Sequence, residues 1–216
     1  MIHIKKISVV VDNKKIINDF SLKVNSGEII YLVGKNGAGK SSLALSIIGH
    51  PDYNVTGEII IEDQNILDLP IYKRSLAGVF VSMQYPTDLP GVSTYEFLKE
   101  IYKSHYNTVE NFDYILSEIE SIIDFSVDNI KNIQGLSGGQ KKRFELLQLC
   151  LLKPKFIVLD EIDSGMDQDG IKTIKKVIEY LKKKNNPVFL IISHSQEKEL
   201  FGLGKTLFLE NGLINE

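Results

Sequence analysis

The segment from Gly34 to Ser41 reads Gly-Lys-Asn-Gly-Ala-Gly-Lys-Ser and combines glycines with a lysine and a serine at its end. An apolar run, 29–33, precedes it, and a helix-like run that begins at Ser42 follows it. The glycines let the backbone curl so that several N–H groups point at phosphate oxygens, and the positive end of the next helix adds to that attraction. The segment therefore predicts a P-loop that holds the phosphates of a nucleotide.

Each P-loop residue has an expected contact with ATP or Mg²⁺. The Lys40 ammonium is expected to reach the β- and γ-phosphates, and the Ser41 hydroxyl is expected to bind Mg²⁺. The other nucleotide contacts are expected from Gly34, Lys35, Asn36, Gly37, Ala38, Gly39 and Ser42. The alternative is a glycine-rich turn without a ligand, but the strand before the loop and the helix after it favour the P-loop.

A second nucleotide motif is the segment 156–161, Phe-Ile-Val-Leu-Asp-Glu, which has the pattern of a Walker B strand. Its apolar residues predict a buried strand whose C-terminal end lies where ligands of parallel sheets bind. Asp160 is expected to hold Mg²⁺ through water, and Glu161 is expected to orient or deprotonate the attacking water. Taken alone, acids at a strand end are equally compatible with simple solvation.

The composition limits the partners that this chain can have. A length of 216 residues suits one large domain or a core with a subdomain, and a net charge of −3 argues against a general nucleic-acid binder. No apolar run reaches the length of a membrane span, and the N-terminal segment lacks the features of a signal peptide. A single cysteine, Cys150, excludes an internal disulfide and fits a reducing compartment. We therefore expect a cytoplasmic protein without direct membrane insertion.

Periodicity predicts strands that alternate with helices. The first two strands, 2–11 and 16–24, are expected to pair as a hairpin around a turn at 12–14. Further strands are expected at 58–61, 79–83, 156–159, 188–193 and 205–210, and helices from Ser93, over 112–123 and over about 170–184. This order predicts a largely parallel sheet with helices on both faces and an antiparallel side sheet.

The segment from Leu136 to Gln140, Leu-Ser-Gly-Gly-Gln, separates one P-loop family from the others. By itself Ser-Gly-Gly can be a helix-capping turn, but here a helical run follows it and leads to the Walker B strand. That order resembles the signature motif of ABC-type ATPases. Gln84 stands where this family has its Q-loop glutamine, residues 164–167 resemble its D-loop, and His194 follows a strand as the switch histidine does.

The resemblance covers essentially the whole chain and implies a P-loop ABC-ATPase fold. Such an α/β fold has a mixed, largely parallel RecA-like core sheet, an N-terminal antiparallel β side sheet and an inserted α-helical subdomain. Residues 1–216 would form a single ABC ATPase domain. Within it, 1–85 and 153–216 would be the nucleotide-binding core, and 86–152 would be the helical subdomain with the signature motif.

The resemblance also implies Mg²⁺-dependent hydrolysis of ATP by two copies of the chain. Glu161, His194 and Gln84 would be catalytic, and Gln84 would also bind the metal. A helix that starts at the signature is an anion site without its own Walker lysine. In a head-to-tail dimer, the ATP held by one copy would therefore be contacted by the second copy through Ser137, Gly138 and Gly139.

Several short sequence segments are similar to those of one branch of this family, the SufC proteins. These are the ATPase subunits of the SUF iron–sulfur cluster assembly system. Residues 49–59, 84–93, 138–143 and 160–167 carry this similarity. The chain differs from the usual SufC wording at Gln140, Phe144, Ile162 and Met166. The similarity implies SufB-like and SufD-like scaffold proteins as partners.

Two other functions are alternatives to iron–sulfur cluster assembly. Most ABC ATPases drive membrane transporters, so an ATP-binding subunit of a transporter is the first alternative. A regulatory or DNA-maintenance relative would normally carry a long coiled coil between the Walker motifs, and no sustained heptads occur here.

The cysteine and histidine content narrows the role within an assembly system. A protein-bound iron–sulfur cluster normally needs several Cys or His ligands, and Cys150 lies alone in an apolar helix. His3, His50 and His105 are scattered without metal-ligand spacing. The cluster is therefore expected to form on the partners, while this chain contributes mechanical work.

Overall fold

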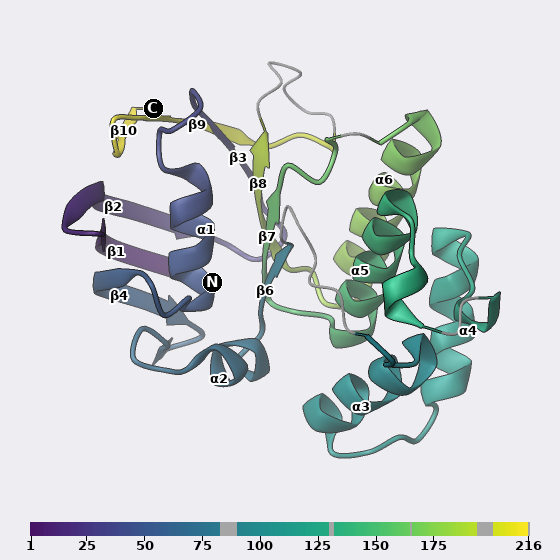
Figure 1. Cartoon of the computed structure of the whole chain (residues 1–216). Helices are drawn as coiled ribbons and strands as arrows, with labels where there is room; N and C mark the ends of the chain where they lie inside the picture. Colours follow the sequence, from purple (N-terminus) through teal and green to yellow (C-terminus); the bar gives the residue numbers. More distant parts are fainter. Residues whose placement is uncertain (83–89, 130–131, 165, 194–200, 216) are drawn as a thin grey trace. The chain divides into compact units, whose positions relative to one another are not determined.

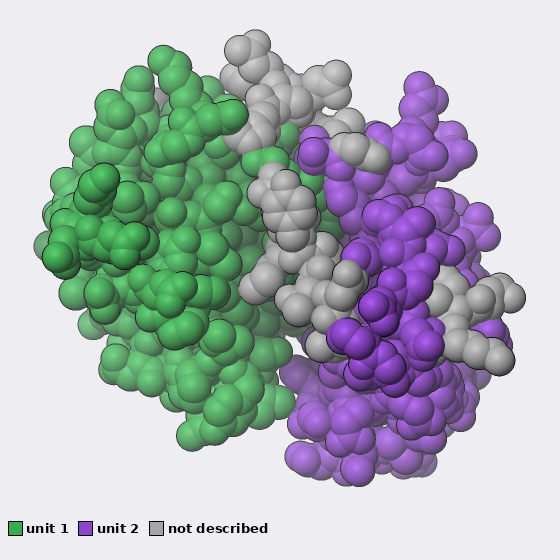
Figure 2. Space-filling model, in the orientation of Figure 1, with its two compact units in different colours: residues 1–83, 154–162, 185–216 green, residues 84–153, 163–184 purple. Residues whose placement is uncertain are grey.

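The computed structural model describes residues 1–82, 90–129, 132–164, 166–193 and 201–215. The chain divides into two compact units (Figure 2). The first unit contains residues 1–83, 154–162 and 185–216, and the second contains 84–153 and 163–184. The sequence-based division places 163–184 in the nucleotide-binding core, whereas the contacts of this segment assign it to the second unit.

A six-stranded sheet forms one layer of the first unit (Figure 1). Its strand order is β10 (Leu213–Asn215), β9 (Lys205–Glu210), β3 (Ile29–Val33), β8 (Val188–Ser193), β7 (Phe156–Asp160) and β6 (Val79–Ser82). All neighbouring pairs are parallel except β10 with β9. Every residue of β7 and β8 is buried, which explains why these strands read as continuous apolar runs.

A four-stranded antiparallel sheet forms the other layer of the first unit. Its order is β2 (Lys14–Val24), β1 (Ile2–Val11), β4 (Asn54–Ile61) and β5 (Gln64–Asn65). The β1–β2 turn places Asp12 and Asn13 at φ 46° and 62°. Positive φ at both positions of a two-residue turn matches the twist of the flanking strands, so the short loop fixes the predicted hairpin.

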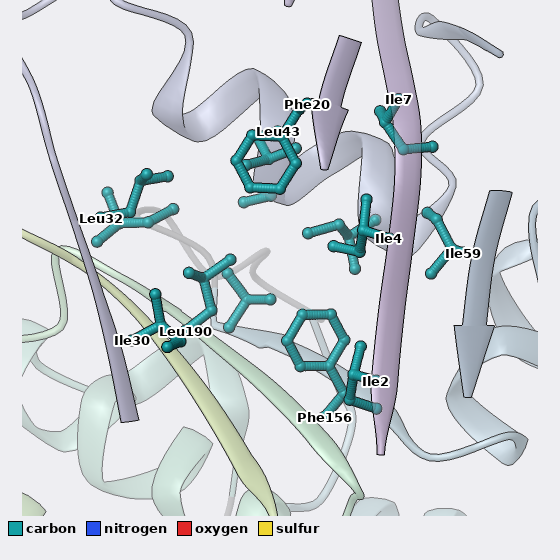
Figure 3. Packing of buried hydrophobic residues seen from close by; sticks show 14 of the residues in the cluster. Ile2, Ile4, Ile7, Phe20, Ile30, Leu32, Leu43, Ile59, Phe156 and Leu190 are labelled. Carbon is teal, nitrogen blue, oxygen red and sulfur yellow. The ribbon is translucent and has the colours of Figure 1, made fainter. Parts of the chain in front are cut away.

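Helix α1 (Lys40–Ile48) contacts strands of both sheets and lies between them. Leu43, Ala44 and Ile47 of this helix are almost fully buried. Figure 3 shows Leu43 near Phe20, together with side chains from both sheets in one apolar core. The short helix α2 (Ile71–Leu76) follows the antiparallel sheet and leads into β6. The core of the first unit therefore surrounds the helix that begins at the P-loop.

The second unit consists mainly of helices. These are α3 (Thr94–Tyr106), α4 (Phe112–Ile123), α5 (Gly138–Leu152) and α6 (Gln168–Lys184), with short 3-10 turns at Val127–Asn129 and Ile133–Gly135. Helix α5 contacts the other three and buries residues all around its surface. The predicted start of α3 is confirmed, because Ser93 is its N-cap and the Ser93 hydroxyl accepts a hydrogen bond from the Glu96 backbone N–H at 3.4 Å.

The predicted fold is confirmed, with differences at the ends of elements. β2 begins at Lys14 and β4 at Asn54, both earlier than expected, and α6 begins at Gln168. The short elements β5, α2 and β10 and the two 3-10 turns were not predicted, because each is too short to show a periodic pattern. β5 and β10 form by pairing with the longer strands β4 and β9. Among the described residues, no helix is both long and apolar enough for a bilayer span.

Candidate nucleotide-binding site

The P-loop connects β3 to α1 within the first unit (Figure 1). A Cβ atom at Gly34 would collide with the Leu209 carbonyl oxygen, so β9 requires glycine there. Gly39 is the N-cap of α1 at φ 104°, and a Cβ atom there would lie 2.8 Å from Ile17 Cδ1. At Gly37 no described atom lies within 4 Å of the corresponding Cβ position. The ends of the loop are thus fixed by packing, while its centre faces open space.

The Lys40 side chain folds back over the P-loop. Its ammonium donates hydrogen bonds to the carbonyl oxygens of Gly34 at 2.7 Å and Lys35 at 3.2 Å, and the residue is only 5% exposed. Burial lowers the pKa of Lys40 below its ordinary value, while the negative charges of Glu161 and Asp160 act in the opposite direction. One ammonium and two carboxylates therefore face the same part of the first unit.

The two Walker B acids differ in their backbone conformation. Asp160 ends β7 and is 7% exposed. Glu161 follows at φ 51°, a left-handed conformation that is uncommon for a residue with a side chain. Its N–H donates to the Ile192 carbonyl oxygen of β8 at 3.0 Å. Such conformations cost free energy and gather at functional sites, so the hydrogen bond to β8 holds Glu161 in a position that the strand alone would not give it.

Oxygen groups suited to Mg²⁺ lie at the P-loop and at the end of β7. Ser41 is exposed in the first turn of α1, and Asp160 supplies a carboxylate. These hard donors fit Mg²⁺, which usually takes one or two carboxylates and completes its shell with phosphates and water. In the described part of the chain, no group of three or more His, Cys, Asp or Glu side chains could hold a metal ion. The donor set therefore fits a metal ion that arrives with a nucleotide.

The signature segment forms the N-terminus of α5 in the second unit. Ser137 is the N-cap, and its hydroxyl accepts a hydrogen bond from the Gln140 N–H at 3.4 Å. The Gln140 side-chain oxygen in turn accepts from the Ser137 N–H at 2.9 Å, which completes a capping box. Cβ positions at Gly138 and Gly139 have no described atom within 4 Å. The start of α5 is therefore capped by its own side chains and has open space beside its two glycines.

The D-loop segment lies beside the signature helix within the second unit. The Lys142 ammonium of α5 donates a hydrogen bond to the Ser164 carbonyl oxygen. The Asp167 carboxylate accepts a hydrogen bond from the Gly170 N–H at 2.8 Å in the first turn of α6. The sequence did not identify Lys142 as a link, although its place in the second turn of α5 put it near the signature.

Three residues of the predicted motifs, Gln84, His194 and Gly165, lie outside the described residues. The described chain adds a feature that the sequence did not suggest. A cavity of about 470 Å³ lies between the first half of the P-loop, 34–38, and the end of β9 with its following turn, 208–211. The sequence did contain one sign of this cavity. Phe208 is an apolar residue at a position of β9 where the alternation of buried and exposed residues points outward, and it is 41% exposed.

Comparison with known proteins agrees with these motifs. The sequence pattern described as ABC transporter matches residues 17–164. A probable ATP-dependent transporter, ycf16, of Antithamnion sp. is 38% identical over 206 residues, which cover 91% of this chain and 82% of that protein. The chain belongs to the ABC transporter ATPase family. Another relative, the probable ATP-dependent transporter slr0075 of Synechocystis sp., is 38% identical to this ABC ATPase. The matched region covers 91% of this chain and 80% of the relative.

Solved structures resemble this ABC ATPase over its whole length. An ATP-binding subunit of an ABC transporter superposes with a TM-score of 0.85 at 21% identity and covers 100% of this chain and 88% of its own. A dimeric ATP-binding cassette in a post-hydrolysis state, bound to ADP and Pi, gives a TM-score of 0.83 at 17% identity, with coverages of 100% and 97%. At these identities the likeness concerns the fold. Family membership confirms the predicted ATPase activity.

Replacement of Lys40 tests the P-loop contacts. Lys40→Ala removes the buried ammonium, and loss of a hydrogen bond to a charged group typically costs about 1.5–3 kcal/mol, so ATP should bind roughly 10- to 100-fold more weakly. Calorimetric titration with Mg·ATP gives the affinity. Lys23→Ala, which removes an exposed lysine of β2, is the control and should bind as the wild type does. Equal affinity of the Lys40 variant and the control would refute the P-loop assignment.

Proposed function

We propose that this ABC ATPase is a SufC-like subunit that drives conformational change in a SufB/SufD-type scaffold during iron–sulfur cluster assembly. The observation that carries the proposal is the sequence of residues 160–167, Asp-Glu-Ile-Asp-Ser-Gly-Met-Asp. Transporter ATPases usually have Asp-Glu-Pro-Thr-Ser at the start of this segment. The segments 49–59 and 84–93 support it in the same way. In this proposal the protein acts in the cytoplasm, without binding nucleic acid.

The environment of Cys150 supports a role in which the cluster forms on the partners. Cys150 is 0% exposed in α5, and burial raises the pKa of its thiol. A buried, protonated thiol is a poor metal ligand, because the thiolate is the form that binds metals. The subunit would therefore deliver the free energy of ATP binding and hydrolysis, while its partners would supply the ligands of the cluster.

The P-loop and the Walker B acids would hold and orient the nucleotide. The backbone N–H groups of 34–42 would surround the phosphates, and the Lys40 ammonium would exchange its carbonyl partners for phosphate oxygens. Ser41, Asp160 and Gln84 would hold Mg²⁺, which would supply positive charge against the phosphates. Because Lys40 is buried, its charge acts in a region of low dielectric, where attraction to phosphate is stronger than in water.

Hydrolysis would depend on groups that act on the attacking water and on the γ-phosphate. Glu161 would accept a proton from the water or orient it, in a position fixed by its bond to β8. His194 would contact the region of the γ-phosphate, and Gln84 would sense it. Loss of the γ-phosphate would then release the contacts that hold the closed state, which gives a reversible clamp.

A second copy of the chain would complete each site. The Gly138 and Gly139 N–H groups at the start of α5 would form an anion site, and Ser137 would add a hydroxyl. In a head-to-tail dimer this start would face the phosphates held by the P-loop of the other copy. Two ATP molecules would lie between the copies, so nucleotide binding would close the dimer and move the attached partners.

Replacement of Glu161 tests the proposed chemistry. Glu161→Gln preserves the shape of the side chain but removes its basicity, and loss of a general base typically slows a reaction by about 10²- to 10⁴-fold. ATP should still bind, and a closed dimer should accumulate in size-exclusion chromatography. Phosphate release gives the rate, and Glu179→Gln, an exposed acid on α6, is the control. Wild-type turnover by the Glu161 variant in the presence of partners would exclude the role.

A transporter subunit is the second candidate function. It is favoured by the names of the relatives, which include two probable ATP-dependent transporters and a probable ABC transporter ATP-binding protein of Streptococcus pyogenes that is 36% identical. The two functions differ in the protein that the ATPase moves. A membrane permease encoded beside the gene would favour the transporter, and suf-type neighbours would favour cluster assembly.

Replacement of residues in segment 85–92 tests the partner. Tyr85 and Leu89 lie outside the described residues, in a segment that contains two prolines and a glycine, Tyr-Pro-Thr-Asp-Leu-Pro-Gly-Val. We propose that this segment and the adjoining helix α3 dock the SufB-like and SufD-like proteins. Leu89→Asp with Tyr85→Ala should abolish co-purification with them while ADP affinity is unchanged.

The control for docking is Leu203→Asp, which alters a leucine that is 81% exposed in the first unit. This variant should retain both partners. If the double variant also retains them, the docking surface lies elsewhere. Capture of a membrane permease by the wild-type protein would favour the transporter function instead.

A further inference from the structure

An arginine is buried at the end of α1 that lies opposite the P-loop. Arg74 of α2 is 5% exposed, and its guanidinium contacts the last turn of α1. Its Nη1 donates hydrogen bonds to the carbonyl oxygens of Ser46 at 2.8 Å and Ile47 at 2.9 Å. The last carbonyl groups of a helix have no partner in the next turn, so Arg74 supplies one to the Ile47 carbonyl oxygen and adds a second donor to that of Ser46, which also accepts from the Gly49 N–H.

The same guanidinium ties α1 to the segment that precedes α2. Its Nε donates to the Leu69 carbonyl oxygen at 2.8 Å, and its Nη2 donates to the Leu67 carbonyl oxygen. Within the described part of the chain, all of these acceptors are backbone carbonyls, and no ion pair of Arg74 occurs. A positive charge at the C-terminal end of a helix is favourable, because the helix dipole is negative there.

Gly49 shows how closely the guanidinium fits the helix end. This residue is the C-cap of α1 at φ 86°, and its N–H donates to the carbonyl oxygens of Leu45 and Ser46. A Cβ atom at Gly49 would lie 2.7 Å from Arg74 Cζ and Nε. Only glycine allows both the left-handed conformation and the approach of the arginine. The helix end and Arg74 therefore form one packed unit.

We propose that Arg74 is a positioning residue for nucleotide binding, which fixes the C-terminal end of α1 and so holds Lys40 and Ser41 at the other end in place. Helix α1 has 9 residues. A helix of that length spans about 14 Å and is rigid, so a shift or tilt at one end displaces the other. Displacement of binding groups by about 1 Å is enough to weaken contacts with a ligand substantially.

The position of Arg74 also connects the P-loop helix to β6. Arg74 lies in α2, which ends at Leu76, and β6 begins at Val79. The Ala77 and Gly78 N–H groups extend the end of α2 through hydrogen bonds to Lys73 and Ser75 carbonyl oxygens. A change at α1 would therefore reach β6, the strand that precedes Gln84, through a short and hydrogen-bonded path.

Binding of Mg·ADP to two Arg74 variants tests the inference, which rests on nucleotide binding at the P-loop. Arg74→Met keeps the apolar stem but removes the charge and every donor, and Arg74→Lys keeps the charge but cannot reach four carbonyl oxygens. Both should raise the dissociation constant for Mg·ADP in calorimetric titration, by about tenfold for Met and less for Lys. Lys73→Met, an exposed neighbour in α2, is the control and should bind as the wild type does.

The titration separates positioning from a purely structural role. A structural role alone would lower the number of binding sites, because some chains unfold, but would leave the dissociation constant of the folded chains unchanged. An unchanged constant in both variants, or in Arg74→Lys if Arg74→Met does not fold, would overturn the proposal. If the wild-type protein does not bind Mg·ADP, the P-loop assignment fails instead.

Hydrogen exchange of the wild-type protein gives a test without any substitution. If fixation of α1 favours nucleotide binding, nucleotide binding must favour the fixed state by the same factor. Mg·ADP should therefore slow exchange of the Lys73, Arg74 and Ala77 amides, whose N–H groups form backbone hydrogen bonds in α2. The β4–β5 turn at 62–63 should be unaffected. Equal exchange of the α2 amides with and without Mg·ADP would contradict the proposal.

Discussion

The two ends of helix α1 impose the constraint on which the nucleotide site depends. The helix is buried between two sheets, so polar groups at its ends need partners. At the C-terminal end, Gly49 and Arg74 fill this requirement. At the N-terminal end, the N-cap is Gly39, which has no side chain to accept a hydrogen bond. The free N–H groups there, and the buried ammonium of Lys40, make this end of the helix suited to an anion.

Helix α5 meets the same requirement in a different way. Ser137 and Gln140 close a capping box, so the helix start is satisfied by the chain itself. The capping box uses the N–H groups of Ser137 and Gln140, and open space lies at the Cβ positions of Gly138 and Gly139, so a further ligand could approach the helix start there. This difference explains the proposed division of roles: the P-loop end would hold the nucleotide, and the signature end of the other copy would add to a phosphate already bound. Each contribution would be weak alone, which suits a clamp that must open again.

Motifs and long periodic elements could be predicted from the sequence, because each depends on residues that are close together in the chain. The glycine pattern of 34–41 and the apolar run of β7 defined the P-loop and the Walker B strand. Contacts between distant segments could not be predicted. The hydrogen bond from Glu161 to Ile192 and those from Arg74 to the end of α1 depend on how strands and helices pack. In the sequence, Arg74 follows another basic residue, Lys73, in a short mixed segment whose apolar residues Ile71, Tyr72 and Leu76 are exposed, so no periodic pattern marks Arg74 as the buried position.

In the proposed dimer, each ATP site is built from the P-loop of one copy and the signature of another. The most direct measurement mixes Lys40→Ala chains with Ser137→Arg chains and follows phosphate release. Neither variant alone can form an intact site, but a mixed dimer contains one intact P-loop facing one intact signature. The mixture should regain activity, up to about a quarter of the wild-type rate if the chains pair at random into dimers. A mixture as inactive as its components, together with a wild-type rate per chain that is the same at every protein concentration, would contradict the proposed dimer.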